Sequence, residues 1–215
     1  ASLIRTGSTV LTHCNAGWLA FVDIGTATAP LYAAQARGVD FRVLCDETRP
    51  RCQGASLTAW ELAQQGIRHA VIADNAAGAL MQRGDIDLVI VGADRVLART
   101  GHVTNKVGTY TKAVLAHRHG IPFYVAIPQS TLDWDCTSWQ SIPIEERSAD
   151  EVLCASGWAT LPGGRSRRLS VRIANPSSPA LNPGFDVTPP ELITGIITPE
   201  GIFPPGELRR LRRLR

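Results

Sequence analysis

Reactive side chains follow several short apolar runs of this sequence. The run "VLTH" is followed by Cys14, "FRVL" is followed by "CDETRP" from Cys45, and "AVIA" is followed by Asp74. The run "LVIVGA" ends before Asp94 and Arg95. If these runs are neighbouring parallel strands, their carboxyl ends meet on one rim, which is where ligands bind in open parallel sheets. The sequence therefore predicts a site that combines a thiol, several carboxylates and an arginine.

Cys14 is the first candidate for chemistry because it stands where a strand passes into a turn, in "LTHCNAG". A thiol at such a junction is partly exposed, and nearby cations or peptide N–H groups can lower its pKa. His13 precedes it, but adjacent residues of a strand point to opposite faces, so we do not expect a Cys–His pair. The alternative for a single cysteine among apolar residues is a small core side chain.

Asp94 is the second candidate and lies in "VGADR". The small residues Gly92 and Ala93 before it allow a ligand to approach closely. A carboxyl group near an apolar floor can have a raised pKa and act as an acid or a base. The alternatives for Asp94 are a helix cap or a salt bridge with Arg95.

Two further positions are candidates for binding phosphate. Asn105 and Lys106 are expected to open a helix after a turn at Gly101, and a helix N-terminus attracts anions. Gln53 stands directly before Gly54, at the start of another expected helix. The alternative at both positions is simple helix capping. The sequence contains no G-x-G-x-x-G or Walker motif, so it does not support a dinucleotide or nucleoside triphosphate.

Strand-like runs alternate with helix-like stretches along most of the chain. The runs are "STVLTH" at 8–13, "FRVL" at 41–44, "AVIA" at 70–73, "LVIV" at 88–91 and "FYVAI" at 123–127. Helices are expected from an N-cap at Ser56 to Gly66, after Asn75, and from Asn105 to Gly120. The runs lack polar alternation, which is typical of strands buried on both faces. The alternation predicts right-handed βαβ units and an α/β fold, a Rossmann-like three-layer sandwich with a mostly parallel sheet.

The last third of the chain has a weaker pattern. The stretches "LPGGRSRR" and "NPSSPALNP", between residues 136 and 183, are expected to be loops. Thr188 is expected to cap a helix whose first turn contains two prolines. Residues 206–215 are a basic tail, which we expect to be a frayed, solvated terminus, with a short amphipathic helix as the alternative.

The composition is that of a globular protein, with 215 residues of which 44% are hydrophobic and 19% charged. No apolar run reaches the roughly 20 residues that span a bilayer, and no signal peptide opens the chain, so we expect a cytoplasmic protein without membrane contact. The net charge of +3 becomes −2 without the five arginines of the tail, which argues against a nucleic-acid partner. The five cysteines are an odd number without a CxxC pair, which argues against disulfides and zinc.

Several motifs together resemble one family. They are "LTHCNAG", "DETRPRCQGASLTAWEL", "IADNAAGALM", "VGADR", "NKVGTY", "HGIPFYVAIPQSTLD", "IPIEER" and "NPGFDVTPPELITGIIT". In this order they resemble the S-methyl-5-thioribose-1-phosphate isomerases over most of residues 8–200. That family belongs to a larger group with ribose-1,5-bisphosphate isomerases and the regulatory subunits of the translation-initiation guanine-nucleotide exchange factor.

The resemblance implies an aldose–ketose isomerase of methionine salvage, which converts 5-methylthioribose 1-phosphate to 5-methylthioribulose 1-phosphate without a metal or organic cofactor. It implies that Cys14 and Asp94 are the catalytic pair and that Gln53, Asn105 and Lys106 bind the substrate. It also implies a homodimer, and a Rossmann-like catalytic domain over residues 1–215 that normally follows a helical N-terminal domain. That domain is not in this sequence, so we expect a missing N-terminal segment or a companion chain.

One departure from the family lies directly after Cys14. The family usually continues with small residues and two glycines before "YGT", whereas this chain has "WLAFVDIGT", with Trp18, Phe21, Val22 and Asp23. The substrate range is therefore open. The alternatives are a ribose-1,5-bisphosphate isomerase, which needs a second phosphate site, and a non-catalytic regulatory subunit, which would not need the Cys14 and Asp94 pair.

Overall fold

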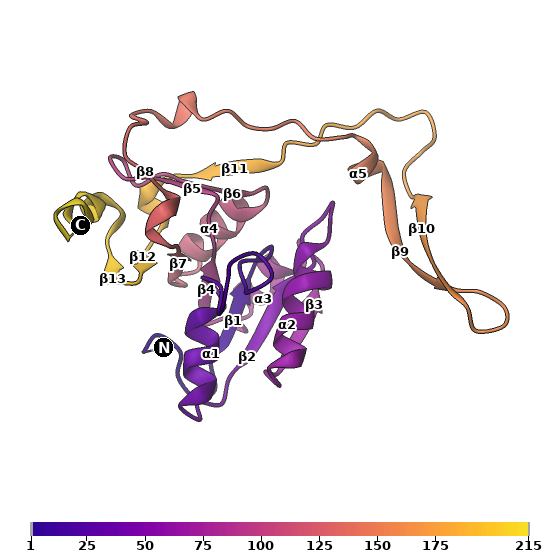
Figure 1. The fold of residues 1–215 in the computed structure, drawn as a ribbon, viewed down its shortest axis with the longest axis horizontal. Coiled ribbons are helices and arrows are strands. Elements are labelled where there is room, and N and C mark those ends of the chain that lie inside the picture. Colours follow the sequence, from indigo (N-terminus) through magenta and orange to yellow (C-terminus); the bar gives the residue numbers. More distant parts are fainter. Residues whose placement is uncertain (1, 215) are drawn as a thin grey trace.

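A seven-stranded sheet forms the centre of the molecule (Figure 1). The computed structural model describes residues 2–214, and it describes the side chains as far as Arg212. The strands are β1 (Thr9–Thr12), β2 (Arg42–Asp46), β3 (His69–Ile72), β4 (Leu88–Val91), β7 (Phe123–Ala126), β12 (Gly195–Thr198) and β13 (Gly201–Phe203). Their order is β13-β12-β7-β4-β1-β2-β3, and only the edge strand β13 is antiparallel to its neighbour. The predicted α/β class with a mostly parallel sheet is confirmed.

The order of the strands reverses between β1 and β4. From β1 the chain builds β2 and β3 outward on one side, and it then returns to build β4, β7 and β12 on the other side. In a doubly wound sheet such a reversal leaves a crevice at the carboxyl ends of the two central strands, because their connections leave in opposite directions. Cys14 follows β1 and Asp94 follows β4, so the topology brings both candidates to this crevice.

Helices cover both faces of the sheet and complete the three layers. They are α1 (Ala29–Ala36), the π-helical turn η1 (Gly54–Thr58) with α2 (Ala59–Gln64), α3 (Ala76–Gln82) and α4 (Thr109–Arg118). The helices α1 and α2 pack with Val10 and Ile90 in one core, and α3 and α4 pack with Leu11 and Val89 in a second core. Consecutive residues of β1 and β4 thus face different cores, which explains why these strands are apolar without alternation.

Strand β3 is an exception to the predicted burial of strands on both faces. It is the edge strand of the sheet, and Val71 is 46% exposed. The apolar residues of "AVIA" therefore do not distinguish an edge strand from a central one. A second correction concerns Ser56, which lies inside η1 rather than at a helix N-cap and donates its hydroxyl to the carbonyl of Cys52 (2.7 Å).

A second, four-stranded sheet lies beyond the carboxyl ends of β4 and β7, and the sequence patterns did not predict it. It contains β11 (Phe185–Thr188), β6 (Val103–Lys106), β5 (Arg95–Leu97) and β8 (Leu132–Asp133), in this order. Asn105 and Lys106 end strand β6, and α4 begins only at Thr109. The prediction that these two residues open a helix is therefore wrong.

Short elements connect this sheet to the rest of the chain. They are η2 (Gln129–Thr131), η3 (Trp139–Ser141), α5 (Asp150–Leu153) and η4 (Pro190–Leu192). The helix predicted after Thr188 is only the single 3-10 turn η4, because the chain turns back at once into β12.

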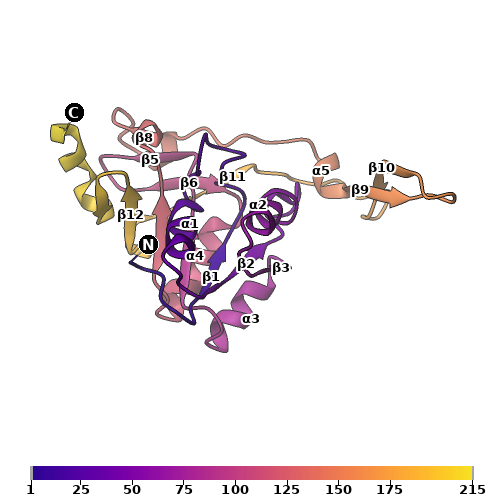
Figure 2. The same ribbon diagram turned by 60° about the horizontal axis from the view of Figure 1, so that its bottom comes forward.

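A two-stranded hairpin projects from the body of the molecule (Figures 1 and 2). It consists of β9 (Cys154–Thr160) and β10 (Ser166–Arg172), which pair antiparallel. The prediction of a loop in "LPGGRSRR" is wrong for the strand that begins at Ser166. An exposed hairpin has no buried face, so its sequence shows no apolar alternation, and Trp158 is 75% exposed.

The basic tail is anchored over its described residues and is not frayed there, and Arg215 lies outside the described residues. It forms the 3-10 helix η5 (Pro205–Leu214), and Leu208 and Leu211 are fully buried in the core that contains α3 and α4. Arg212 lies over the ring of Trp134, 5.9 Å from its centroid. The two leucines are spaced so that they lie on one apolar face of the helix. The composition of the tail does not reveal this face, because arginines are its most frequent residues.

Candidate functional site

Cys14 and Asp94 lie on the same rim, at the ends of the two central strands. Cys14 is half-buried and has a left-handed backbone (φ 64°), and Asp94 is exposed. Among the described residues no basic group lies within 4 Å of the Asp94 carboxylate, because Arg95 pairs with Asp133 (3.2 Å). The alternative of an Asp94–Arg95 salt bridge is therefore excluded. The charge of Asp94 acts on the thiol of Cys14, which places the two groups in one electrostatic environment.

Two threonines from different segments hold the backbone of Cys14. The N–H of Cys14 donates to the hydroxyl of Thr48 (2.8 Å), and the hydroxyl of Thr58 donates to the carbonyl of Cys14 (2.6 Å). Thr48 itself has a positive φ of 67° and donates its hydroxyl to the carbonyl of Asp46 (3.0 Å). The strained backbone at Cys14 and Thr48 is thus stabilised by hydrogen bonds between the ends of β1 and β2.

Glu61 of α2 organises the loop that follows Cys14. This fully buried carboxylate accepts hydrogen bonds from the backbone N–H groups of Trp18 (2.9 Å) and Leu19 (3.1 Å). It also accepts from the side chains of Asn15 (3.0 Å) and Tyr32 (3.0 Å). A buried carboxylate needs this number of donors, because an unsatisfied charge is costly in the interior. Motif analysis did not single out Glu61, although it lies in the quoted "LTAWEL".

Gly17 makes this arrangement sterically possible. A Cβ atom at residue 17 would lie 1.8 Å from Oε2 of Glu61. We expect Gly17→Ala to lower the free energy of unfolding by about 1–3 kcal/mol and to reduce turnover, because the loop must move away from Glu61. Gly157→Ala is the matched control, since nothing lies within 4 Å of its Cβ position. Chemical denaturation checks the effect, and equal stability of the two variants would contradict it.

Lys106 is a buried ammonium group without a counter-ion. The residue is only 4% exposed, and in the part of the chain that the structure describes no carboxylate lies within 4 Å of its nitrogen. Burial lowers the pKa of Lys106, while the neighbouring thiol of Cys14 raises it and Arg147 lowers it further. An unpaired buried cation is an unusual feature of a protein interior, and it indicates a place for an anionic ligand.

Asn105 and Gln53, the other two predicted binding residues, differ in how they are engaged. The side-chain amide of Asn105 donates to the hydroxyl of Thr109 (3.0 Å), which in turn donates to the carbonyl of Lys106 (2.6 Å). Asn105 thereby supports the turn after Lys106. Gln53 precedes η1 as predicted, and its carbonyl oxygen Oε1 is buried without a hydrogen-bond partner among the described residues. Gln53 is therefore free to bind a ligand.

Arg51 is a further cation near this site that the sequence analysis did not single out. It is half-exposed, and its only ion pair among the described residues is a loose contact with Glu151 (3.8 Å). Glu151 is held more tightly by Arg147 (2.8 Å), which is the main reason why the pKa of Glu151 falls to about 2. Arg51 could have been identified from the sequence by its position two residues before Gln53, in "RPRCQG".

Cys14 and Asp94 both favour their protonated forms more than usual. Burial raises the pKa of Cys14 above its ordinary value of 9.0, and Asp94 raises it further, although Lys106 and Arg51 oppose the shift. Partial desolvation of the carboxyl group likewise raises the pKa of Asp94, although the residue as a whole is exposed at the rim, and Lys106 opposes the shift. The peptide N–H of Asn15 and the cations Lys106 and Arg51 lower the pKa of Cys14, as expected, but burial outweighs them. These shifts suit two groups that donate and accept protons, rather than a thiolate nucleophile.

His13 does not pair with Cys14, as predicted. Both of its ring nitrogens bond elsewhere, to Asp46 (2.8 Å) and to the carbonyl of Val107 (2.9 Å). His13, Asp46 and Asp74 have ligand atoms close enough to share a metal ion. The ammonium of Lys112 already bonds to Asp46 (3.2 Å), and both oxygens of Asp74 accept backbone N–H groups (2.7 Å each), so these groups are engaged within the protein.

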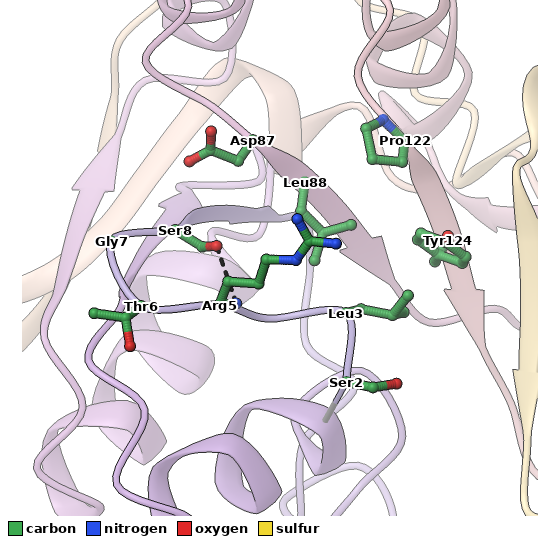
Figure 3. A pocket seen from close by; sticks show the side chains of 10 residues that line it. All are labelled: Ser2, Leu3, Arg5, Thr6, Gly7, Ser8, Asp87, Leu88, Pro122 and Tyr124. Carbon is green, nitrogen blue, oxygen red and sulfur yellow. Dashed lines mark hydrogen bonds between the residues drawn. The ribbon is translucent and has the colours of Figure 1, made fainter.

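Two cavities lie away from the rim. One of about 610 Å³ opens at the amino-terminal ends of the strands, beside Arg5, Asp87 and Tyr124 (Figure 3). It lies at the edge of the sheet opposite to the one where doubly wound proteins bind ligands. The other, of about 470 Å³, lies beside the small sheet and is lined by His102, Tyr110, Trp139, Val187, Pro189 and Glu191.

The fold and the rim define a doubly wound α/β domain with a thiol, a carboxyl and an unpaired ammonium at its switch point. Residues 1–205 match the model of the Initiation factor 2 subunit family, and the chain belongs to this family. The resemblance inferred from the motifs is thereby confirmed. No helix among the described residues is long and apolar enough to cross a membrane.

Relatives with two different names are similar to this chain. Methylthioribose-1-phosphate isomerases of Sulfurimonas denitrificans and Rhizobium meliloti are 58% and 56% identical over 92% and 91% of the chain. The 5-methylthioribose 1-phosphate isomerase of Pyrococcus horikoshii has a TM-score of 0.86 and 44% identity over 99% of the chain. The translation initiation factor eIF-2B subunit delta of A. fulgidus has a TM-score of 0.83 and 44% identity over 95% of the chain.

The chain spans about half the length of these relatives. It covers 54% of the Sulfurimonas protein, 53% of the Rhizobium protein, 56% of the Pyrococcus structure and 55% of the A. fulgidus structure. The match therefore concerns the doubly wound domain and its rim.

Proposed function

We propose that this chain carries the active site of an aldose–ketose isomerase that converts 5-methylthioribose 1-phosphate to 5-methylthioribulose 1-phosphate in methionine salvage. The observation that carries the proposal is the grouping of Cys14, Asp94 and the unpaired, buried Lys106 at the switch point of the sheet. The names of the relatives that are 55–58% identical support the choice of substrate.

The reaction needs groups that handle protons at oxygen and at carbon. The phosphate on C1 prevents spontaneous opening of the sugar ring, so the bond between C1 and the ring oxygen must break while that oxygen gains a proton. The hydrogen on C2 then moves to C1, and the C2 hydroxyl loses its proton and becomes the ketone. A positioned acid or base contributes about 10²–10⁴ in rate to such steps.

We assign the proton transfers at the sugar oxygen atoms to Asp94 and those at the carbon atoms to Cys14. Asp94 is exposed at the rim and unpaired, so its carboxyl can protonate the ring oxygen and accept the hydroxyl proton. Cys14 is half-buried with a raised pKa, which makes its sulfur the stronger base, so the sulfur can accept the proton that leaves C2 and return it to C1 in the less polar part of the site. In a direct hydride shift from C2 to C1 the pair would manage only the protons on oxygen.

Lys106, Asn105 and Gln53 are proposed to bind the substrate. The ammonium of Lys106 meets the phosphate, and the buried free oxygen of Gln53 accepts a hydrogen bond from a sugar hydroxyl. Asn105 supports the turn after Lys106 through Thr109 and offers its remaining amide atoms to the ligand. No metal or organic cofactor takes part in this proposal.

Lys106→Met tests the phosphate site, and we expect it to weaken substrate binding but to stabilise the fold. We expect KM to rise roughly tenfold to hundredfold, the usual value of one charged hydrogen bond, with a smaller change in kcat. Because burial lowers the pKa of Lys106, its ammonium is less favourable in the folded than in the unfolded state at neutral pH, so the variant without ligand should be more stable.

Thermal unfolding with inorganic phosphate checks this prediction. Phosphate should raise the midpoint of the wild type and leave that of Lys106→Met unchanged. Lys112→Met is the control, because it removes the partner of the buried Asp46 and should destabilise the protein. A pure loss of kcat in Lys106→Met would argue against a role in binding phosphate.

Two other functions are distinguishable from this proposal. A ribose-1,5-bisphosphate isomerase needs a second cationic site near C5, whereas a methylthio group needs apolar surface. The loop after Cys14 offers such surface, since Trp18 lies against Trp60 with ring centroids 5.3 Å apart. Phe21 is partly buried and packs against the core that contains α1. A regulatory subunit is favoured by the family match and by the likeness to the A. fulgidus protein.

The test is to offer several pentose 1-phosphates to the complete protein and to observe ketose formation by NMR. We expect turnover of 5-methylthioribose 1-phosphate and much slower turnover of ribose 1,5-bisphosphate. Preference for the bisphosphate would support the second function, and no turnover of any sugar phosphate would support the regulatory one.

The proposal also covers the cellular location and the assembly of the complete protein. We propose a cytoplasmic homodimer, and we propose that an N-terminal segment or a companion chain completes the phosphate site, since the relatives are about twice as long as this chain. Light scattering of the complete protein tests the dimer, and a mass of one subunit would contradict it.

A further inference from the structure

A buried group of charges lies directly behind Cys14. His13 is 2% exposed, Asp46 is fully buried and Lys112 is 3% exposed. Nδ1 of His13 lies 2.8 Å from Oδ2 of Asp46, and Nζ of Lys112 lies 3.2 Å from the same oxygen. Buried charges of this kind are costly unless they have a task or mutual compensation. The proposed isomerisation does not use any of these groups directly.

The contacts of His13 define which of its ring nitrogens carry hydrogen. Nε2 lies 2.9 Å from the carbonyl of Val107, which can only accept, so Nε2 donates. Nδ1 lies 2.8 Å from Oδ2 of Asp46, and the ammonium of Lys112 lies 3.2 Å from the same oxygen. Asp74 and Asp186 are the other charged groups that face this cluster. Both ring nitrogens of His13 are therefore engaged, Nδ1 with Asp46 and Nε2 with the carbonyl of Val107.

His13 joins the two halves of the rim. It is the residue before Cys14 at the end of β1, and Val107 is the residue after Lys106 at the end of β6. The approach depends on the next residue, Gly108, because a Cβ atom there would lie 2.9 Å from Nε2 of His13. The bond between His13 and Val107 thus links the segment that carries the thiol to the segment that carries the ammonium.

We propose that His13 is a positioning residue that fixes the distance between Cys14 and Lys106, with Asp46 and Lys112 holding its ring in place. The inference rests on the proposed function, because the two side chains it places are those that handle the carbon atom and the phosphate. A displacement of about 1 Å between such groups is enough to lower a rate by about a hundredfold.

Two isosteric variants separate this role from a purely structural one. In His13→Gln the amide nitrogen takes the place of Nε2 and keeps the bond to Val107, whereas in His13→Asn it takes the place of Nδ1 and keeps the bond to Asp46. We expect His13→Gln to keep kcat/KM within about tenfold of the wild type and His13→Asn to lose about a hundredfold. We expect the opposite order in stability, because His13→Asn preserves both partners of the buried carboxylate.

The measurements are steady-state kinetics and chemical denaturation of both variants in the complete protein. Activity losses that follow the losses in stability, with His13→Asn the more active variant, would overturn the proposal. If either variant does not fold, ¹⁵N NMR of the wild-type histidines decides. A hydrogen on Nε2 of His13 that exchanges slowly with solvent supports the bond to Val107, and its absence overturns the proposal. An inactive wild type in which this Nε2 hydrogen is present would refute the isomerase function and leave the contact intact.

Discussion

Cys14→Ser is expected to lower kcat by roughly 10²–10⁴-fold, with little change in KM or in the free energy of unfolding. Serine fills nearly the same volume and keeps both backbone bonds of residue 14, to Thr48 and Thr58. Its hydroxyl is a far weaker acid than the thiol, so it cannot deliver a proton to carbon. Rapid-mixing NMR or a coupled assay of the complete protein measures the loss.

Cys136→Ser is the matched control for this variant. Cys136 is also half-buried, and its thiol contacts the carbonyl of Ser138 (3.2 Å), far along the chain from the rim. We expect it to keep full activity. Near-normal turnover in Cys14→Ser would remove the thiol from the mechanism and leave Asp94 as the only acid or base at the site.

Asp94→Asn is expected to lower kcat by a similar factor and to make the protein somewhat more stable at neutral pH. Burial raises the pKa of Asp94 from 3.8 in the folded state. The proton is therefore bound more tightly in the folded than in the unfolded state, so the stabilising contribution is complete below pH 3.8 and is lost as the pH rises through the folded pKa. At pH 7 asparagine removes the remaining unfavourable charge.

Asp133→Asn provides a control with the opposite sign. The backbone N–H of Cys136 is the main reason why the pKa of Asp133 is lowered in the folded state. The Asp133 carboxylate contributes stability above its unfolded pKa, and this stability is lost as the pH falls through its folded pKa. Asparagine at this position should therefore destabilise the protein at pH 7. Unfolding by urea at pH 4 and pH 7 compares the two variants. A stability loss in Asp94→Asn at pH 7 would contradict the account of that carboxyl.

The sequence predicts the central sheet and the proposed catalytic pair for the same physical reason. Strands buried on both faces are continuous apolar runs, so β1, β2, β4 and β7 are visible without a structure. The residues after such strands must lie on one rim, and this places Cys14 and Asp94 together. Their distance along the chain is no obstacle, because the topology depends only on the order of strands and helices.

The remainder depends on contacts that no local pattern records. Lys106 ends the four-residue strand β6, whose last three residues, "TNK", are polar and resemble a helix start, and the strand pairs with β5 and β11. Glu61 stands in an ordinary helical stretch, and only the fold reveals that it accepts hydrogen bonds from the loop after Cys14. The buried leucines of the tail were missed because arginines dominate its composition.

A double-mutant cycle of Cys14 and Asp94 tests most directly whether the two groups work as one site. Single-turnover rates of Cys14→Ser, Asp94→Asn and the double variant are measured in the complete protein at saturating 5-methylthioribose 1-phosphate. If the two residues act on the same substrate in one proton-transfer sequence, the double variant should be about as slow as the slower single variant, because the loss of either group already disables the step. Losses that multiply would show two independent contributions and would contradict a shared site at the switch point.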